Sequence, residues 1–111
     1  METRQKIKEE EAWIRKLINE NSSQKDVAIR AWNRMLDYFL TNDFLDGHNH
    51  MEIINYIYKN RRALHETFYC IAWKNYMAER TLFRYRKKYV RCFKRYYAEE
   101  QEKEKFRCVI E

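Results

Sequence analysis

Residues 80–97 read RTLFRYRKKYVRCFKRYY, and they lie within a longer stretch, 49–107, that contains neither glycine nor proline. Apolar residues recur through this stretch in steps that are mostly three or four, which places them on one face of a helix. The recurring positions are Ile53, Ile57, Leu64, Phe68, Ile71, Ala78, Leu82, Tyr85, Tyr89, Cys92 and Tyr96. The spacing predicts one long helix over 49–107, whose segment 80–97 is basic and aromatic.

Two shorter helices are predicted before this stretch. Residues 3–20 carry a narrow apolar stripe, and residues 23–41 have the clearest amphipathic pattern in the chain. Ser23 is expected to cap the second helix. A loop around the only glycine, Gly47, leads to Asn49, which together with a glutamate three residues later forms a variant capping box at the start of the long helix.

The length of the third helix decides the predicted architecture. Its 59 residues would span about 88 Å if unbroken, whereas a compact domain of this size has a radius of gyration of about 13 Å. The only weak points are Asn60 and Asn75, and asparagine costs a helix only about a few tenths of a kcal/mol. We therefore expect a single all-α domain, residues 1–111, in which two short antiparallel helices pack on the first half of the long third helix and its basic C-terminal part projects. The expected core tryptophans are Trp13, Trp32 and Trp73.

Composition narrows the class of protein. Hydrophobic residues make up 45% of the chain, which is ordinary for a packed domain. Three widely spaced cysteines without a Cys-x-x-Cys pair favour free thiols in a reducing compartment, so an intracellular location, cytoplasmic or nuclear, is predicted. The longest apolar run, 68–73, is far shorter than a membrane span, and no such span is expected.

The net charge of +6 is distributed unevenly. Residues 1–55 sum to −2 and residues 56–111 to +8, and segment 80–97 holds eight basic residues and no acidic one. Such a block attracts polyanions. The first hypothesis is therefore a non-enzymatic interaction or structural protein that binds an acidic protein surface, or self-associates, through this segment. The residues expected at the interface are Phe83, Arg84, Arg86, Lys87, Lys88, Tyr89, Arg91, Phe93, Lys94, Arg95 and Tyr96.

Three other interpretations of segment 80–97 stay open. Its basic and aromatic residues could neutralise phosphates and stack on bases, which predicts binding of DNA or RNA. Phe83, Val90 and Tyr96 have nearly the spacing of a calmodulin target helix. Alternatively, the aromatic residues pack inside the fold and the basic residues form a solvated face.

Catalytic and metal sites are not expected. The candidate metal ligands in the predicted loop are Asp43, Asp46, His48 and His50. No further ligand follows them at a recognised spacing, so this segment is interpreted as a polar turn. His65 and Cys70 are five residues apart, which on one helix turns them about 140° away from each other. We predict that the chain is not an enzyme and has no metal or cofactor.

Overall fold

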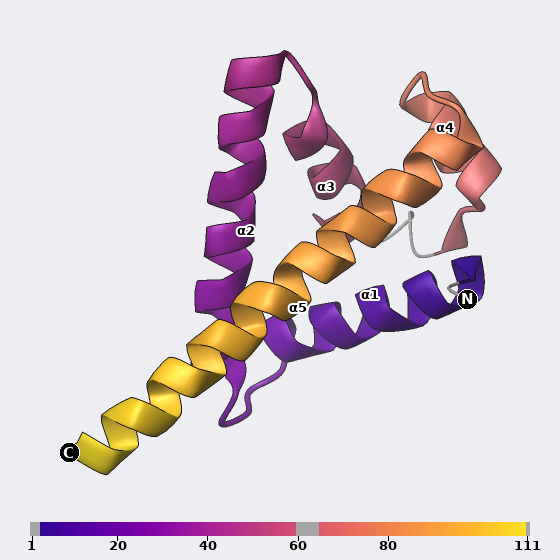
Figure 1. Cartoon of the computed structure of the whole chain (residues 1–111). Coiled ribbons are helices and arrows are strands. Elements are labelled where there is room, and N and C mark those ends of the chain that lie inside the picture. Colours follow the sequence, from indigo (N-terminus) through magenta and orange to yellow (C-terminus); the bar gives the residue numbers. More distant parts are fainter. Residues whose placement is uncertain (1–2, 60–64, 111) are drawn as a thin grey trace.

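The computed structural model describes residues 3–59 and 65–110, with side chains as far as residue 107. Within these residues the chain is helical and contains no strand (Figure 1). This confirms the predicted all-α class. The described residues form five helices, which are α1 (Arg4–Asn19), α2 (Lys25–Asp46), α3 (His50–Lys59), α4 (Phe68–Lys74) and α5 (Glu79–Ile110).

Helix α5 packs across the other helices instead of projecting with its basic segment free. It contacts α1, α2 and α4, and Figure 1 shows it crossing both α1 and α2. The molecule measures 50 × 31 × 27 Å, which leaves no room for a helix of about 88 Å. The predicted projection of residues 80–97 is wrong, because this segment is part of the core. The part of α5 that extends past the other helices is its C-terminal end (Figure 1).

The backbone reverses between α4 and α5, which breaks the predicted long helix. Tyr76 has a φ of 57°, in the left-handed region. Its N–H donates to the carbonyl oxygen of Trp73 at 3.2 Å, and the N–H of Met77 donates to that of Ala72 at 3.0 Å. These two bonds make a Schellman closure, in which the left-handed residue is usually glycine. Helix α4 ends at Asn75, one of the two predicted weak points.

A second interruption separates α3 from α4. Helix α4 begins after Thr67, whose side-chain oxygen accepts a hydrogen bond from the N–H of Cys70 at 3.1 Å. This is an ordinary N-cap, but the helix start at this position was not predicted from the sequence. Asn60, the other predicted weak point, lies outside the described residues. The single helix predicted over 49–107 is thus three separate helices.

Helix α2 continues five residues beyond its predicted end and stops at Gly47, whose φ of 69° is left-handed. Asp43, in the last turns of α2, accepts hydrogen bonds from the backbone N–H groups of His50 and Met51, both at 2.8 Å. Asp43 therefore satisfies two N–H groups at the start of α3, the capping role predicted for Asn49. At the other end of α2, the predicted capping position is off by one residue, because the helix follows Gln24, which makes no side-chain cap.

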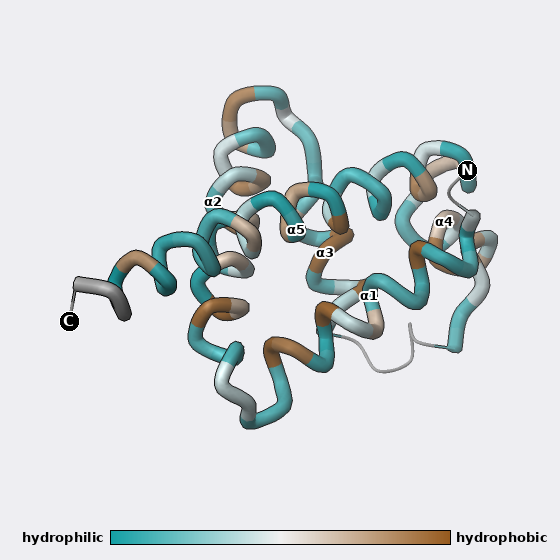
Figure 2. The backbone as a smooth tube through the Cα atoms, turned by 60° about the horizontal axis from the view of Figure 1, so that its bottom comes forward, coloured by the Kyte–Doolittle hydropathy of each residue, from teal (hydrophilic) through white to brown (hydrophobic). Residues whose placement is uncertain are grey.

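The core lies between the inward faces of the five helices, and apolar residues recur along α1, α2 and α5 among hydrophilic ones (Figure 2). Of the three tryptophans predicted to be buried, only Trp32 is. Trp13 is exposed at the edge of the core and meets the rings of Phe93 and Tyr97 edge-on, at 5.8 and 5.6 Å between centroids. Trp73 is 70% exposed. None of the helices in the described part of the chain is long and apolar enough to cross a bilayer.

Candidate functional site

Helix α5 has two opposite faces. Its buried face is formed by Leu82, Arg86, Tyr89, Val90, Phe93, Tyr97 and Glu100. Its exposed face carries a line of cations that recur every three or four residues, as neighbours on a helix surface do. We call these residues the basic stripe: Arg80, Arg84, Lys88, Arg91 and Arg95.

The structure divides the predicted interface residues between these faces. The exposed ones are Arg84, Lys88, Arg91, Lys94 and Arg95; the half-buried ones are Phe83, Lys87 and Tyr96; the buried ones are Arg86, Tyr89 and Phe93. The predicted projection of segment 80–97 would leave its aromatic side chains without cover within the chain, but those of Tyr89 and Phe93 are fully buried. A partner can reach the cations of the stripe, but it cannot reach these two rings without unpacking the core.

The cations of α5 differ in how they are paired. Lys94 forms an ion pair with Glu10 of α1, and Arg95 pairs with Glu99 one turn further along α5 at 3.6 Å. Within the described residues, Arg84 and Lys88 form no ion pair. These two side chains are consequently the ones most available to an external carboxylate.

A cluster of aromatic and apolar side chains lies directly before the basic stripe. We call it the aromatic turn, and it consists of the exposed Trp73 and Tyr76 and the half-buried Met77. Trp73 is 70% and Tyr76 97% exposed. They line an open hollow of about 710 Å³ together with Lys74 and Ala78. This surface was not predicted from the sequence, because Trp73 was expected in the core and Tyr76 inside a continuous helix.

Arg86, predicted to bind a partner, forms instead an ion pair inside the protein. Its Nη2 and Nε donate to the two carboxylate oxygens of Glu11 in α1, at 2.5 and 3.0 Å, and both side chains are almost completely buried. The guanidinium lies 4.3 Å from the ring centroid of Phe68, and the hydroxyl of Tyr58 donates to Glu11 at 3.4 Å. Burial raises the pKa of Tyr58 well above its ordinary value. This group joins α1, α3, α4 and α5 and serves the fold.

His50 is the second polar group in the core. Its Nδ1 lies 2.7 Å from the hydroxyl oxygen of Tyr89, and its ring packs against those of Phe39 and Tyr85 at 5.1 and 4.7 Å between centroids. Burial lowers the pKa of His50 below its ordinary value of 6.5 and raises that of Tyr89. Both groups are therefore neutral in the folded protein near pH 7.

We expect the free energy of unfolding to fall as the pH drops below 6.5. The pKa of His50 is lower in the folded state, so its neutral form stabilises the fold fully above 6.5, and this stability is lost as the pH falls towards the folded pKa. Urea unfolding between about pH 7.5 and pH 5.5 measures the fall. His50→Gln should reduce the slope, while His65→Gln, at an exposed position away from His50, should keep it. Equal slopes in the wild type and His50→Gln would show that another group is responsible.

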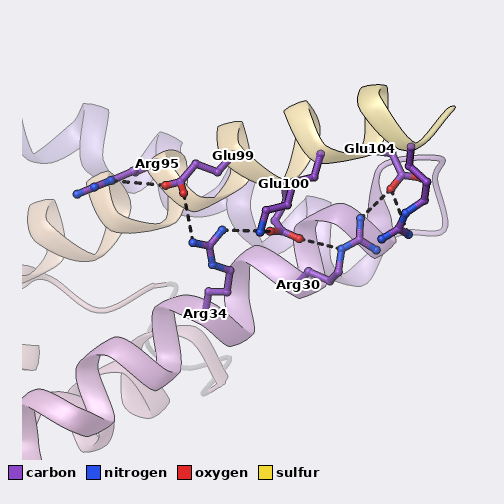
Figure 3. Close-up of polar contacts among 8 residues, drawn as sticks. Arg30, Arg34, Arg95, Glu99, Glu100 and Glu104 are labelled. Carbon is purple, nitrogen blue, oxygen red and sulfur yellow. Dashed lines mark hydrogen bonds and ion pairs between the residues drawn. The ribbon is translucent and has the colours of Figure 1, made fainter. Parts of the chain in front are cut away.

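Arginines of α2 and glutamates of α5 form a cluster near the C-terminal end of the chain (Figure 3). Arg30 donates to Glu100 and to Glu104, both at 2.9 Å, while Arg34 donates to Glu100 at 3.0 Å and to Glu99 at 3.2 Å. Burial alone would raise the pKa of Glu100, but the hydrogen bonds from Arg30 and its other cationic neighbours outweigh burial and lower it. The cluster fastens this part of α5 to α2.

Replacing Glu100 with glutamine should lower the free energy of unfolding by about 1–2 kcal/mol, because it weakens charge-assisted bonds to two arginines that solvent still partly screens. Glu102→Gln is the matched control, since Glu102 is exposed on the same helix, and we expect it to change stability by less than about 0.5 kcal/mol. Chemical denaturation measures both effects. Similar losses in the two variants would mean that the cluster contributes nothing specific.

No three residues among the histidines, cysteines, aspartates and glutamates of residues 3–59 and 65–110 gather closely enough to hold a metal ion. In the predicted polar turn, Asp43 caps α3, and Nδ1 of His50 lies within hydrogen-bonding distance of the hydroxyl of Tyr89.

Comparison with known protein families, curated proteins and solved structures gives no match to this chain.

Proposed function

We propose that this protein is a non-enzymatic helical interaction protein, and that its basic stripe and aromatic turn bind an acidic segment of another protein. One observation carries the proposal. Trp73, at the end of α4, and Tyr76, in the turn that follows, are 70% and 97% exposed, and they lie directly before α5, the helix whose outer face holds five cations. Large aromatic side chains that stay mostly exposed are costly in water, and a partner that covers them gains this free energy.

The residue types on this surface favour a protein partner. Tryptophan, tyrosine, methionine and arginine are the residues enriched in protein interfaces and their hot spots. From Arg80 to Arg95 the stripe spans about 22 Å, a length that suits about four turns of a partner helix. An acidic segment with a few apolar side chains would match both parts of the surface.

Binding of nucleic acid by the same helix has less support. Sequence-tolerant binding of single strands relies on aromatic rings that stack on bases. Of the six rings in segment 80–97, Tyr89, Phe93 and Tyr97 are buried and the other three are half-buried. A calmodulin-like partner would need the apolar face of α5, which includes Val90 and is turned into the core. Support for binding of nucleic acid therefore comes from the exposed cations, which can neutralise phosphates.

The test measures binding of two labelled probes by fluorescence anisotropy. One is a synthetic helical peptide of glutamate, leucine and phenylalanine, and the other is a duplex DNA of similar length. The double variant Arg84→Glu, Lys88→Glu and the double variant Trp73→Ala, Tyr76→Ala should each raise the dissociation constant for the peptide about tenfold or more. The control Lys6→Glu, Lys16→Glu reverses two exposed cations on α1 and should bind like the wild type.

Binding of the DNA probe distinguishes a protein-binding surface from a nucleic-acid-binding surface. A phosphate-binding surface loses affinity steeply with salt, and its affinity does not depend on Trp73 or Tyr76. If the DNA binds more tightly than the peptide and the aromatic variant binds both like the wild type, the proposed protein-binding function is wrong.

A further inference from the structure

A second exposed apolar surface lies at the far end of α2. Phe44 is 87% and Leu45 70% exposed, and Leu40, one turn before Phe44, is also exposed. The surrounding sequence is acidic, because residues 35–58 contain four aspartates and glutamates and no lysine or arginine. The negative end of the α2 dipole lies at the same place. We call Leu40, Phe44, Leu45 and the exposed Asp37 and Asp46 the acidic apolar end.

This end is the chemical complement of the surface on α4 and α5. Residues 73–95 contain nine lysines and arginines and one glutamate, and the aromatic turn supplies exposed Trp73 and Tyr76. One surface is apolar and acidic, and the other is aromatic and basic. Within one molecule they cannot cover each other, because α3 lies between the end of α2 and the turn before α5 (Figure 1).

We infer that the protein self-associates head to tail: the acidic apolar end of one copy binds the basic stripe and aromatic turn of a second copy. The inference rests on the proposed function, because it names the partner of the same site. A symmetric contact through α2 would place Asp37 and Asp46 against the same residues of the other copy, and one through α5 would oppose Arg84 to arginine. Like charges brought together disfavour both. Contact between the two different surfaces pairs opposite charges, which the contact of either surface with itself does not.

The size of the surfaces sets the strength of the association. Aromatic side chains bury about 150–250 Å² each, so Phe44, Trp73 and Tyr76 with their neighbours give a total near 1,000 Å², at the low end for a specific interface. A weak, concentration-dependent association follows. Because each copy keeps one free surface of each kind, the contact extends into chains or closes into rings.

Sedimentation equilibrium of mixed variants tests the inference. At about 0.1–1 mM protein and low salt, the wild type should show an average mass that exceeds 14.0 kDa and rises with concentration. The double variant Phe44→Ser, Leu45→Ser and the double variant Arg84→Glu, Lys88→Glu should each weaken association about tenfold or more. An equimolar mixture of the two should form a dimer, twice 14.0 kDa, that does not grow, because one intact pair of surfaces remains.

A control variant and the pattern of results distinguish failure of the head-to-tail contact from failure of self-association and of the proposed function. Phe106→Ser removes a side chain that is 68% exposed elsewhere on α5 and should associate like the wild type. All substituted residues are exposed, and circular dichroism verifies that the variants are folded. Association of the wild type without recovery in the mixture would overturn the head-to-tail contact. A monomeric wild type that still binds the acidic peptide would overturn self-association alone, and loss of both would overturn the proposed function as well.

Discussion

Replacing Glu11 with alanine should lower the free energy of unfolding by about 3–5 kcal/mol, since it leaves the buried guanidinium of Arg86 without its counter-charge. The two hydrogen bonds between them, at 2.5 and 3.0 Å, are the main polar connection between α1 and α5 inside the core. A typical domain is stable by only about 5–15 kcal/mol. Thermal and urea unfolding should therefore show a large loss or an unfolded protein.

Two further variants test the physical reason for this loss. Glu9→Ala, at an exposed position on the same helix, should change stability by less than about 0.5 kcal/mol. Removing both charges with Glu11→Leu and Arg86→Met should recover most of the stability, because well-packed apolar residues often replace a buried ion pair without loss. If the double replacement is no more stable than Glu11→Ala, the loss comes from packing and not from the unpaired charge.

Replacing Phe93 with alanine should also lower the free energy of unfolding by about 3–5 kcal/mol. The side chain is fully buried, stacks on Tyr97 at 5.7 Å between ring centroids, and lies 5.8 Å from Trp13 and 6.4 Å from Trp32. Its removal leaves a cavity where α1, α2 and α5 meet. Chemical denaturation measures the loss.

Phe106→Ala is the matched control for this prediction, since Phe106 lies on the same helix but is 68% exposed. We expect it to change stability by less than about 0.5 kcal/mol. The two variants also distinguish two roles for Phe93, packing in the core and binding a partner. A Phe93→Ala variant that keeps its stability but loses binding to the acidic peptide would make this ring an interface anchor, as the sequence suggested.

The sequence predicted the helices well where their ends carry ordinary signals. Residues 3–20 were expected to be helical and α1 covers Arg4–Asn19, because Thr3 caps it and its apolar residues repeat clearly. The break between α4 and α5 was missed because a tyrosine occupies the position where glycine usually marks a Schellman closure. Without that signal, a stretch that contains neither glycine nor proline is predicted to be one helix.

The candidate site was predicted in part. The cations that could meet a partner were located, but the aromatic residues between them were not assigned to the opposite face. The helical repeat does distinguish Arg84 and Lys88 from Tyr89 and Phe93; what it cannot show is that a neighbouring helix covers the second pair. One signal was available for the buried ion pair, since Glu11 lies in the apolar stripe four residues after Ile7 and therefore faces the core.

At position 76, the residue that would best stabilise the fold differs from the residue that would best bind a partner. Its left-handed backbone costs about 1–2 kcal/mol for a residue with a Cβ atom, and a side chain that is 97% exposed returns almost no packing energy to the core. Glycine would fit this backbone without strain. On folding grounds alone, a tyrosine is therefore a poor choice at this position. If the aromatic turn binds a partner, the ring that destabilises the isolated protein is the one that stabilises the complex, and part of the chain's stability depends on its being bound.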